Sequence, residues 1–96
     1  MSEEIVRSLS EKAGINRPFV FSSWIFMKAM GKSKIDAASE LGTHRNTLTR
    51  YENRAYDALE FDEYARLVTA CVLTEFRERV GELERSEDWA RQVNRK

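Results

Sequence analysis

The fold of this chain is decided by the stretch "AASELGTHRNTLTRYEN", which runs from Ala37 to Asn53. Its first residues are small, apolar or helix-forming, and Gly42 then offers a break where a positive φ carries no steric penalty. After the break, Leu48 and Tyr51 recur at helical spacing. The pattern predicts two helices joined by a tight turn. Polar side chains at the start of the second helix gain nothing from burial and need a partner outside the core: His44, Arg45, Asn46 and Thr47.

Composition favours one soluble, all-α domain. The chain has 96 residues, of which 42% are hydrophobic and 10% aromatic, enough for a core of moderate size. Four Gly and one Pro give little punctuation for an all-β chain. The longest apolar stretch, Pro18–Met30, contains Lys28 and falls short of the roughly 20 residues that a membrane span needs. The first residues of the chain, "MSEEIV", are acidic where a secretory signal would be basic, so we expect a cytoplasmic protein that binds no membrane.

The charges are segregated along the chain although the net charge is zero. From Arg17 to Arg54 there are seven Lys or Arg against three Asp or Glu, a net charge of +4. From Asp57 to Asp88 there are four Arg against ten Asp or Glu, a net charge of −6. This asymmetry indicates one part that faces a polyanion and another part that faces something else.

Five or six helices are expected. The first should be capped by Ser2 and stop at Gly14. The second should start near Pro18 and stop at Gly31, although its first half, "FVFSSWIF", is equally compatible with a strand. Ser33 should cap the third helix, which precedes the break at Gly42.

A long helix should follow the polar one, from about Leu59 to Val80, with one buried apolar stripe formed by Phe61, Tyr64, Ala65, Val68, Cys71, Val72 and Phe76. Gly81 should interrupt it, and Ser86 should open a last helix that bears Trp89 and Val93.

The spacing of Ala38, Gly42 and Leu48 resembles the helix-turn-helix of the lambda-repressor and Cro-like family, also called XRE-like. Ala38 would let the two helices cross closely, and Leu48 would fill the gap between them. The resemblance covers about residues 24–73. It implies a single domain over 1–96, with an extra N-terminal helix in 1–16, a helix-turn-helix core in 18–73 and a C-terminal helical extension in 74–96. His44 departs from the pattern because a Ser or Thr cap is usual there.

In this family the second helix of the motif lies in the DNA major groove. The resemblance therefore implies that base edges are read by Arg45, Asn46, Thr49 and Arg50. Arginine can fork onto guanine and asparagine onto adenine. Phosphate contacts, which set position rather than sequence, are expected from Lys34, Thr47, Arg54 and Tyr56.

The leading hypothesis is a sequence-specific transcriptional regulator, a small phage or bacterial repressor that binds a palindromic operator in double-stranded DNA as a homodimer. One helix with a local charge of +4 should bind weakly, whereas two helices about 34 Å apart would read successive major grooves. Apolar residues outside the motif could supply the dimer surface: Phe19, Phe21, Trp24, Phe76, Val80 and Trp89. We expect the interface in the C-terminal extension, through Phe76, Val80, Trp89 and Val93.

The alternative is a protein-interaction module, such as an antitoxin, antirepressor or adaptor, whose acidic C-terminal half grips a partner. The zero net charge favours this reading somewhat. An enzyme is not expected, because one His and one Cys without a carboxylate cluster cannot form a triad or a metal site, and nothing indicates a cofactor. Cys71 should be a core residue, and Phe26 stands where the "GKS" at Gly31–Ser33 would need a glycine to form a phosphate-binding loop.

Overall fold

The computed structural model describes the backbone of residues 1–93 and the side chains of residues 1–85. Within residues 1–93 the chain forms helices and connections and no strand. The helices are α1 (Ser2–Lys12), α2 (Pro18–Ala29), α3 (Lys34–Glu40), α4 (Arg45–Ala58) and α5 (Phe61–Val93). The all-α expectation is confirmed, and the strand alternative for the first half of α2 is excluded.

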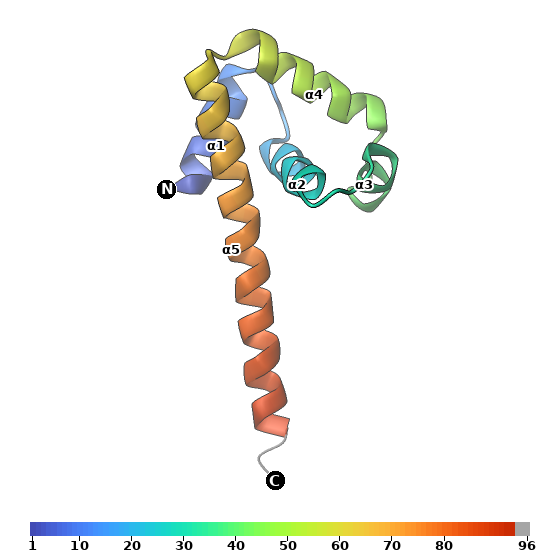
Figure 1. Ribbon diagram of the computed structural model, residues 1–96, viewed down its shortest axis with the longest axis vertical. Coiled ribbons are helices and arrows are strands. Elements are labelled where there is room, and N and C mark those ends of the chain that lie inside the picture. Colours follow the sequence, from blue (N-terminus) through green and yellow to red (C-terminus); the bar gives the residue numbers. More distant parts are fainter. Residues whose placement is uncertain (94–96) are drawn as a thin grey trace.

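The longest helix, α5, organises the molecule (Figure 1). It starts beside the C-terminal end of α4, packs against α1 and α2, and then extends beyond the other helices. On the far side of α2 from α5, α3 packs against both α2 and α4. The resulting molecule measures 57 × 29 × 21 Å, with α5 along the longest dimension.

The first two helices end where glycine was expected to end them. Gly14 and Gly31 follow α1 and α2 with φ of +75° and +87°. Pro18 occupies the first turn of α2, where its missing N–H leaves no hydrogen bond unmade. The expected cap of α1 is wrong, because Met1 is the N-cap residue and Ser2 lies buried inside the first turn.

The core joins residues from all five helices. Phe21, Trp24 and Ile25 of α2 pack with Leu48 and Tyr51 of α4 and with buried residues of the other helices. Phe21 and Trp24 therefore belong to the core, and the expectation that they supply a dimer surface is wrong. An aromatic edge-to-face contact between Phe21 and Tyr51, with ring centroids 6.3 Å apart, connects α2 to α4.

The long helix differs most from the sequence-based expectation. It begins at Phe61 and runs unbroken through Gly81 to Val93, so the interruption at Gly81 and the separate helix opened by Ser86 are wrong. A glycine inside a helix costs about 1 kcal/mol relative to alanine, and the helix formers around it tolerate that cost. Trp89 lies with Val93 in the last part of α5, whose side chains are outside the described residues.

The buried face of α5 is also rotated from the expected stripe. Leu67, Ala70, Cys71, Thr74 and Glu75 are buried, whereas Phe61 is 87% exposed and Phe76 is 56% exposed. Ala65 is likewise exposed, and the others of the expected stripe besides Cys71 are only partly buried.

The physical reason is that two apolar stripes run along α5, and the partners α1 and α2 select only one of them. The Glu75 carboxylate occupies the selected face because it accepts hydrogen bonds from Ser22 Oγ at 2.9 Å and Ser23 Oγ at 3.0 Å.

In the part of the chain that the structure describes, no helix is both long and apolar enough to cross a membrane.

Candidate nucleic-acid interface

The turn between α3 and α4 is built by local hydrogen bonds. Ser33 Oγ caps α3 by accepting from the backbone N–H of Asp36 at 3.2 Å, as expected. At the other end Gly42 takes φ +65°, and the N–H of Thr43 donates to the carbonyl of Ala38 at 3.0 Å. This bond closes α3 in the Schellman manner, which requires a left-handed residue at Gly42. The expected positive φ is thus confirmed.

Side chains on both sides of this turn fix how α3 and α4 meet. Ala38 is buried on α3, and Leu48 is fully buried on α4, within one core cluster. A larger residue in place of Ala38 would push the helices apart, because this interior is filled. The sequence pattern therefore identified the residues that set the relative position of the two helices.

His44 caps α4 with its imidazole. Its backbone is extended, with φ −95° and ψ 144°, and its Nδ1 accepts from the backbone N–H of Asn46 at 3.1 Å. Nδ1 thus takes the place of the usual Ser or Thr oxygen as the capping acceptor, and only a nitrogen that carries no proton can accept this hydrogen bond. The sequence pattern placed His44 where a Ser or Thr cap is usual, but it did not indicate that the imidazole itself would cap the helix.

The four expected base readers lie on α4 outside its buried face. Arg45, Asn46 and Arg50 are exposed, and Thr49 is half-buried. The opposite side of α4 is buried through Leu48, Tyr51 and Ala55. The fixed helix therefore presents a short polar surface to solvent.

Asn53 belongs to the same surface. It is exposed and stands seven residues, or nearly two turns, after Asn46. The helical repeat alone could have identified it in the sequence. Asp57 continues this side of α4 one turn further on, so an acidic residue marks the end of the surface.

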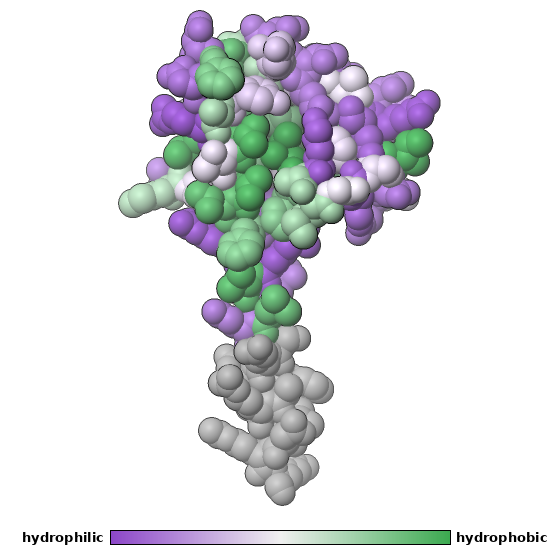
Figure 2. All heavy atoms as spheres, viewed as in Figure 1, coloured by the Kyte–Doolittle hydropathy of each residue, from purple (hydrophilic) through white to green (hydrophobic). Residues whose placement is uncertain are grey.

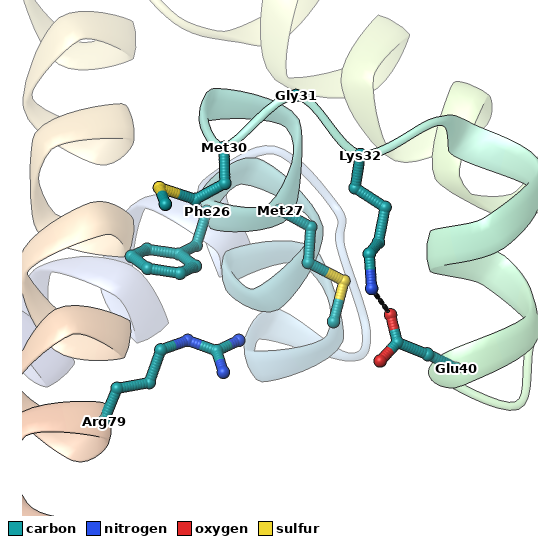
Figure 3. A pocket seen from close by; sticks show the side chains of 7 residues that line it. All are labelled: Phe26, Met27, Met30, Gly31, Lys32, Glu40 and Arg79. Atoms are coloured by element: carbon teal, nitrogen blue, oxygen red, sulfur yellow. Dashed lines mark hydrogen bonds and ion pairs between the residues drawn. The ribbon is translucent and has the colours of Figure 1, made fainter. Parts of the chain in front are cut away.

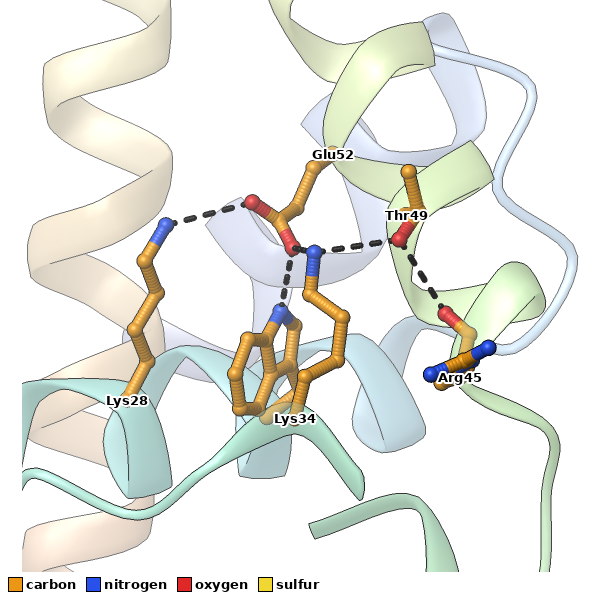
Figure 4. A network of polar contacts seen from close by, with 6 residues as sticks. Lys28, Lys34, Arg45, Thr49 and Glu52 are labelled. Atoms are coloured by element: carbon orange, nitrogen blue, oxygen red, sulfur yellow. Dashed lines mark hydrogen bonds and ion pairs between the residues drawn. The ribbon is translucent and has the colours of Figure 1, made fainter.

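A network of polar contacts centred on Glu52 holds α4 against α2 and the start of α3 (Figure 4). Its Oε1 accepts from Lys34 Nζ at 2.8 Å and from Trp24 Nε1 at 2.8 Å, and its Oε2 accepts from Lys28 Nζ at 3.1 Å. Partial burial alone would raise the pKa of Glu52, but the hydrogen bonds from Lys34, Trp24 and Lys28 together lower it below the usual 4.5. Glu52 is therefore a fixed anion that joins α2 and the start of α3 to α4.

Lys34 is the second centre of this network. Besides Glu52, its ammonium donates to Thr49 Oγ1 at 3.0 Å and lies 5.6 Å from the centroid of the Trp24 ring. Thr49 Oγ1 in turn donates to the Arg45 carbonyl at 3.2 Å. The ammonium of Lys34 is thus paired within the chain and helps to position α4, and its phosphate contact stays a prediction. The hydroxyl proton of Thr49 is also committed, which leaves its methyl group as the part available to a ligand.

Sequence reasoning missed Glu52. A weak signal was present, because Glu52 stands four residues after Leu48 and hence at the border of the inward face of α4. Its partners come from α2 and α3, and only the tertiary fold brings them together.

The remaining expected phosphate contacts do not form one group. Thr47 and Arg54 are seven residues apart and share one border of α4, whereas Tyr56 is seven residues after Thr49 and lies on the opposite border. Arg54 Nη1 donates to the Gly14 carbonyl at 2.9 Å, and the Tyr51 hydroxyl donates to Asn16 Oδ1 at 2.7 Å. These bonds tie the α1–α2 connection to α4.

Tyr56 is one of the exposed residues among the expected phosphate contacts. It is 77% exposed and meets Tyr64 edge to face, with ring centroids 6.0 Å apart. Thr47, by comparison, is half-buried.

Ion pairing separates the cations of this region into two kinds. Lys28 and Lys34 are paired with Glu52, and Lys32 is paired with Glu40. Among the side chains that the structure describes, Arg45 and Arg50 have neither an ion-pair partner nor a hydrogen-bond partner. Two guanidinium groups without a partner among the described side chains therefore lie on the exposed side of α4.

A hollow of about 440 Å³ lies elsewhere, between the end of α2 and α5 (Figure 3). It is lined by Phe26, Met27, Met30, Gly31, Lys32, Glu40 and Arg79. Lys32 and Glu40 pair at its edge, and the Arg79 guanidinium carbon lies 4.6 Å from the centroid of the Phe26 ring. The lining includes no residue of α4, so this hollow is separate from the polar surface described above.

Cys71 takes no part in either site. It is fully buried on α5, and burial together with the nearby charge of Glu75 raises the pKa of its thiol to about 12. The expectation of a core cysteine is confirmed.

A scan against protein-family models, a search of curated proteins and a search of solved structures each gave no match.

Proposed function

We propose that the chain is a sequence-specific transcriptional regulator that binds double-stranded DNA through α4, with α3 and α4 acting as a lambda-repressor-like helix-turn-helix. The observation that supports this most is the set of unpaired, exposed Arg45, Asn46 and Arg50 on one side of a helix whose other side is buried. Neighbouring lysines are paired with carboxylates. A surface that leaves two guanidinium groups and an amide unpaired suits a ligand that offers acceptors, as phosphates and base edges do.

Within this proposal the residues of α4 have distinct roles. Arg45 and Asn46, near the N-terminal end, read base edges in the major groove, and Arg50 and Asn53 extend the contact along it. Thr49 offers its methyl group, which suits the methyl of thymine. Lys34 and Glu52 hold α4 at the angle that this reading needs, and Thr47, Arg54 and Tyr56 border the surface as phosphate contacts.

The regulator acts as a homodimer on a palindromic operator, with no enzymatic step and no cofactor. A single α4 presents few cations, so a second copy is needed for firm binding at physiological salt. The alternative function, a protein-interaction module, is favoured by one observation, namely the exposed apolar side chains along residues 73–83 of α5.

Salt-dependent binding to a random-sequence duplex tests the proposal. The wild-type chain should bind at low salt, and the double variant Arg45→Ala/Arg50→Ala should lose affinity and give a shallower dependence on salt. Arg85→Ala removes an exposed arginine of α5 and is the matched control, which should bind as the wild type does. Equal binding by all three proteins would contradict the proposed interface.

A further inference from the structure

Residues 73–83 of α5 carry an apolar stripe that the protomer leaves exposed. Leu73 is 41% exposed, Phe76 56% and Leu83 65%, and Val80 is half-buried. Figure 2 shows hydrophobic residues gathered on one face of the globular part and continuing onto the projecting helix. The intervals of three, four and three residues place Leu73 and Val80 at a positions of a heptad, and Phe76 and Leu83 at d positions.

This stripe is independent of the protomer's own core. At 100° per residue it lies opposite Leu67, Cys71 and Thr74, which face α1 and α2. Leu73 also lines a hollow of about 280 Å³ between α1 and α5, with Ser2, Ile5, Ala65, Arg66, Thr69 and Ala70. The exposed stripe and this hollow therefore form one continuous surface.

The charges beside the stripe indicate what covers it. In this heptad Arg79 falls at g and Glu84 at e, five residues later. Among the described side chains neither has an ion-pair partner, and Arg79 rests on the Phe26 ring. In a parallel, in-register pair of helices, each g residue faces the e residue five positions later on the other helix. Two copies of α5 would thus bring Arg79 and Glu84 together twice.

An antiparallel pair would have the opposite electrostatics. If the a and d positions are matched by placing Leu73 against Leu83 and Phe76 against Val80, g faces g and e faces e. Arg79 would then lie beside Arg79 of the second copy, and Arg77 beside Arg77. Because like charges at these positions repel, they disfavour the antiparallel pair.

We propose that a second copy of this chain covers the stripe, and that the two α5 helices form a parallel, in-register coiled coil with Leu73, Phe76, Val80 and Leu83 at its core. Parallel helices place both globular parts at the same end of the coiled coil. Two α4 helices can then face one DNA duplex, a consequence that rests on the proposed function, whereas the coiled coil itself does not.

Sedimentation of the full chain without DNA tests the pairing. The wild type should be a dimer, and Val80→Asp should raise its dissociation constant about tenfold or more, since each dimer loses two buried valines and gains two carboxylates. Glu84→Arg should weaken the dimer, and Arg79→Glu/Glu84→Arg should restore it by exchanging the partners. A monomeric wild type, or a double variant as weak as Glu84→Arg, would overturn the proposal. Unchanged thermal melting at dimer-free dilution would show that Val80→Asp folds.

Disulfide cross-linking tests the orientation. In the parallel arrangement Leu83→Cys meets itself at a d position, so mild oxidation should give a covalent dimer. Arg85→Cys at the outward f position is the matched control and should give none, and the native Cys71 is fully buried. A dimer in sedimentation that Leu83→Cys does not cross-link would contradict the parallel orientation. Because no DNA is present, either failure is distinguishable from a failure of the proposed DNA binding.

Discussion

Replacing Glu52 by glutamine tests whether the polar network positions α4. The variant keeps one acceptor oxygen, which can still meet Trp24 and Lys34, but its amide NH₂ then faces the ammonium of Lys28. The variant therefore loses charge-assisted hydrogen bonds at a side chain that is only 19% exposed. We therefore expect Glu52→Gln to lower the free energy of unfolding by about 1–2 kcal/mol at pH 7.

The same variant makes a prediction about pH. The pKa of Glu52 is lower in the folded chain than its usual 4.5, because the hydrogen bonds from Lys34, Trp24 and Lys28 outweigh the effect of its burial. Its stabilisation is therefore fully present above pH 4.5 and is lost as the pH falls through the lower, folded value. The difference between wild type and Glu52→Gln should shrink over that range.

Urea unfolding at pH 7, 5, 4 and 3 measures both effects. Glu78→Gln is the matched control, because Glu78 is exposed and has no hydrogen-bond partner among the described side chains. The control should differ from the wild type by less than about 0.5 kcal/mol. If Glu52→Gln matches the control at pH 7, or if its deficit stays constant down to pH 3, the network does not hold α4 as described.

Three further predictions concern the turn and α4. Arg45→Ala and Asn46→Ala should each cost about 1–3 kcal/mol on the preferred DNA site and relax the preference at one base position, whereas Arg85→Ala should do neither; fluorescence anisotropy on matched and mismatched duplexes measures this. His44→Ala should lower the free energy of unfolding by about 1 kcal/mol, whereas His44→Ser should keep most of the wild-type stability, because serine also caps; chemical unfolding without DNA compares the two. Gly42→Val should lower the melting temperature more than a typical surface change does, because valine cannot take φ +65° without strain, and an unchanged melt would show that the turn tolerates it.

The turn between α3 and α4 could be predicted because its requirements are local. A small residue at Ala38, a positive φ at Gly42 and a branched side chain at Leu48 follow one another at fixed spacing, and each has a steric reason. The outward side of α4 followed from the same helical repeat. The sequence alone was sufficient for these features, since neighbours within about ten residues determine them.

The features that could not be predicted depend on distant partners. Glu52 and Lys34 meet only because α2, α3 and α4 pack together, and Glu75 is buried only because Ser22 and Ser23 lie opposite it. The break expected at Gly81 failed for another reason: a penalty of about 1 kcal/mol is too small to end a helix whose neighbouring residues all favour it.

Selection of bound sequences from random duplex DNA tests the central claim most directly. With the wild-type chain we expect a two-fold symmetric consensus, because two α4 helices of a dimer would read two half-sites about 34 Å apart. The same selection with Asn46→Ala should keep the spacing and lose the preference at one symmetric pair of positions. Recovery of no enriched sequence by the wild type, or of the same consensus by the wild type and Asn46→Ala, would contradict the claim that α4 reads DNA.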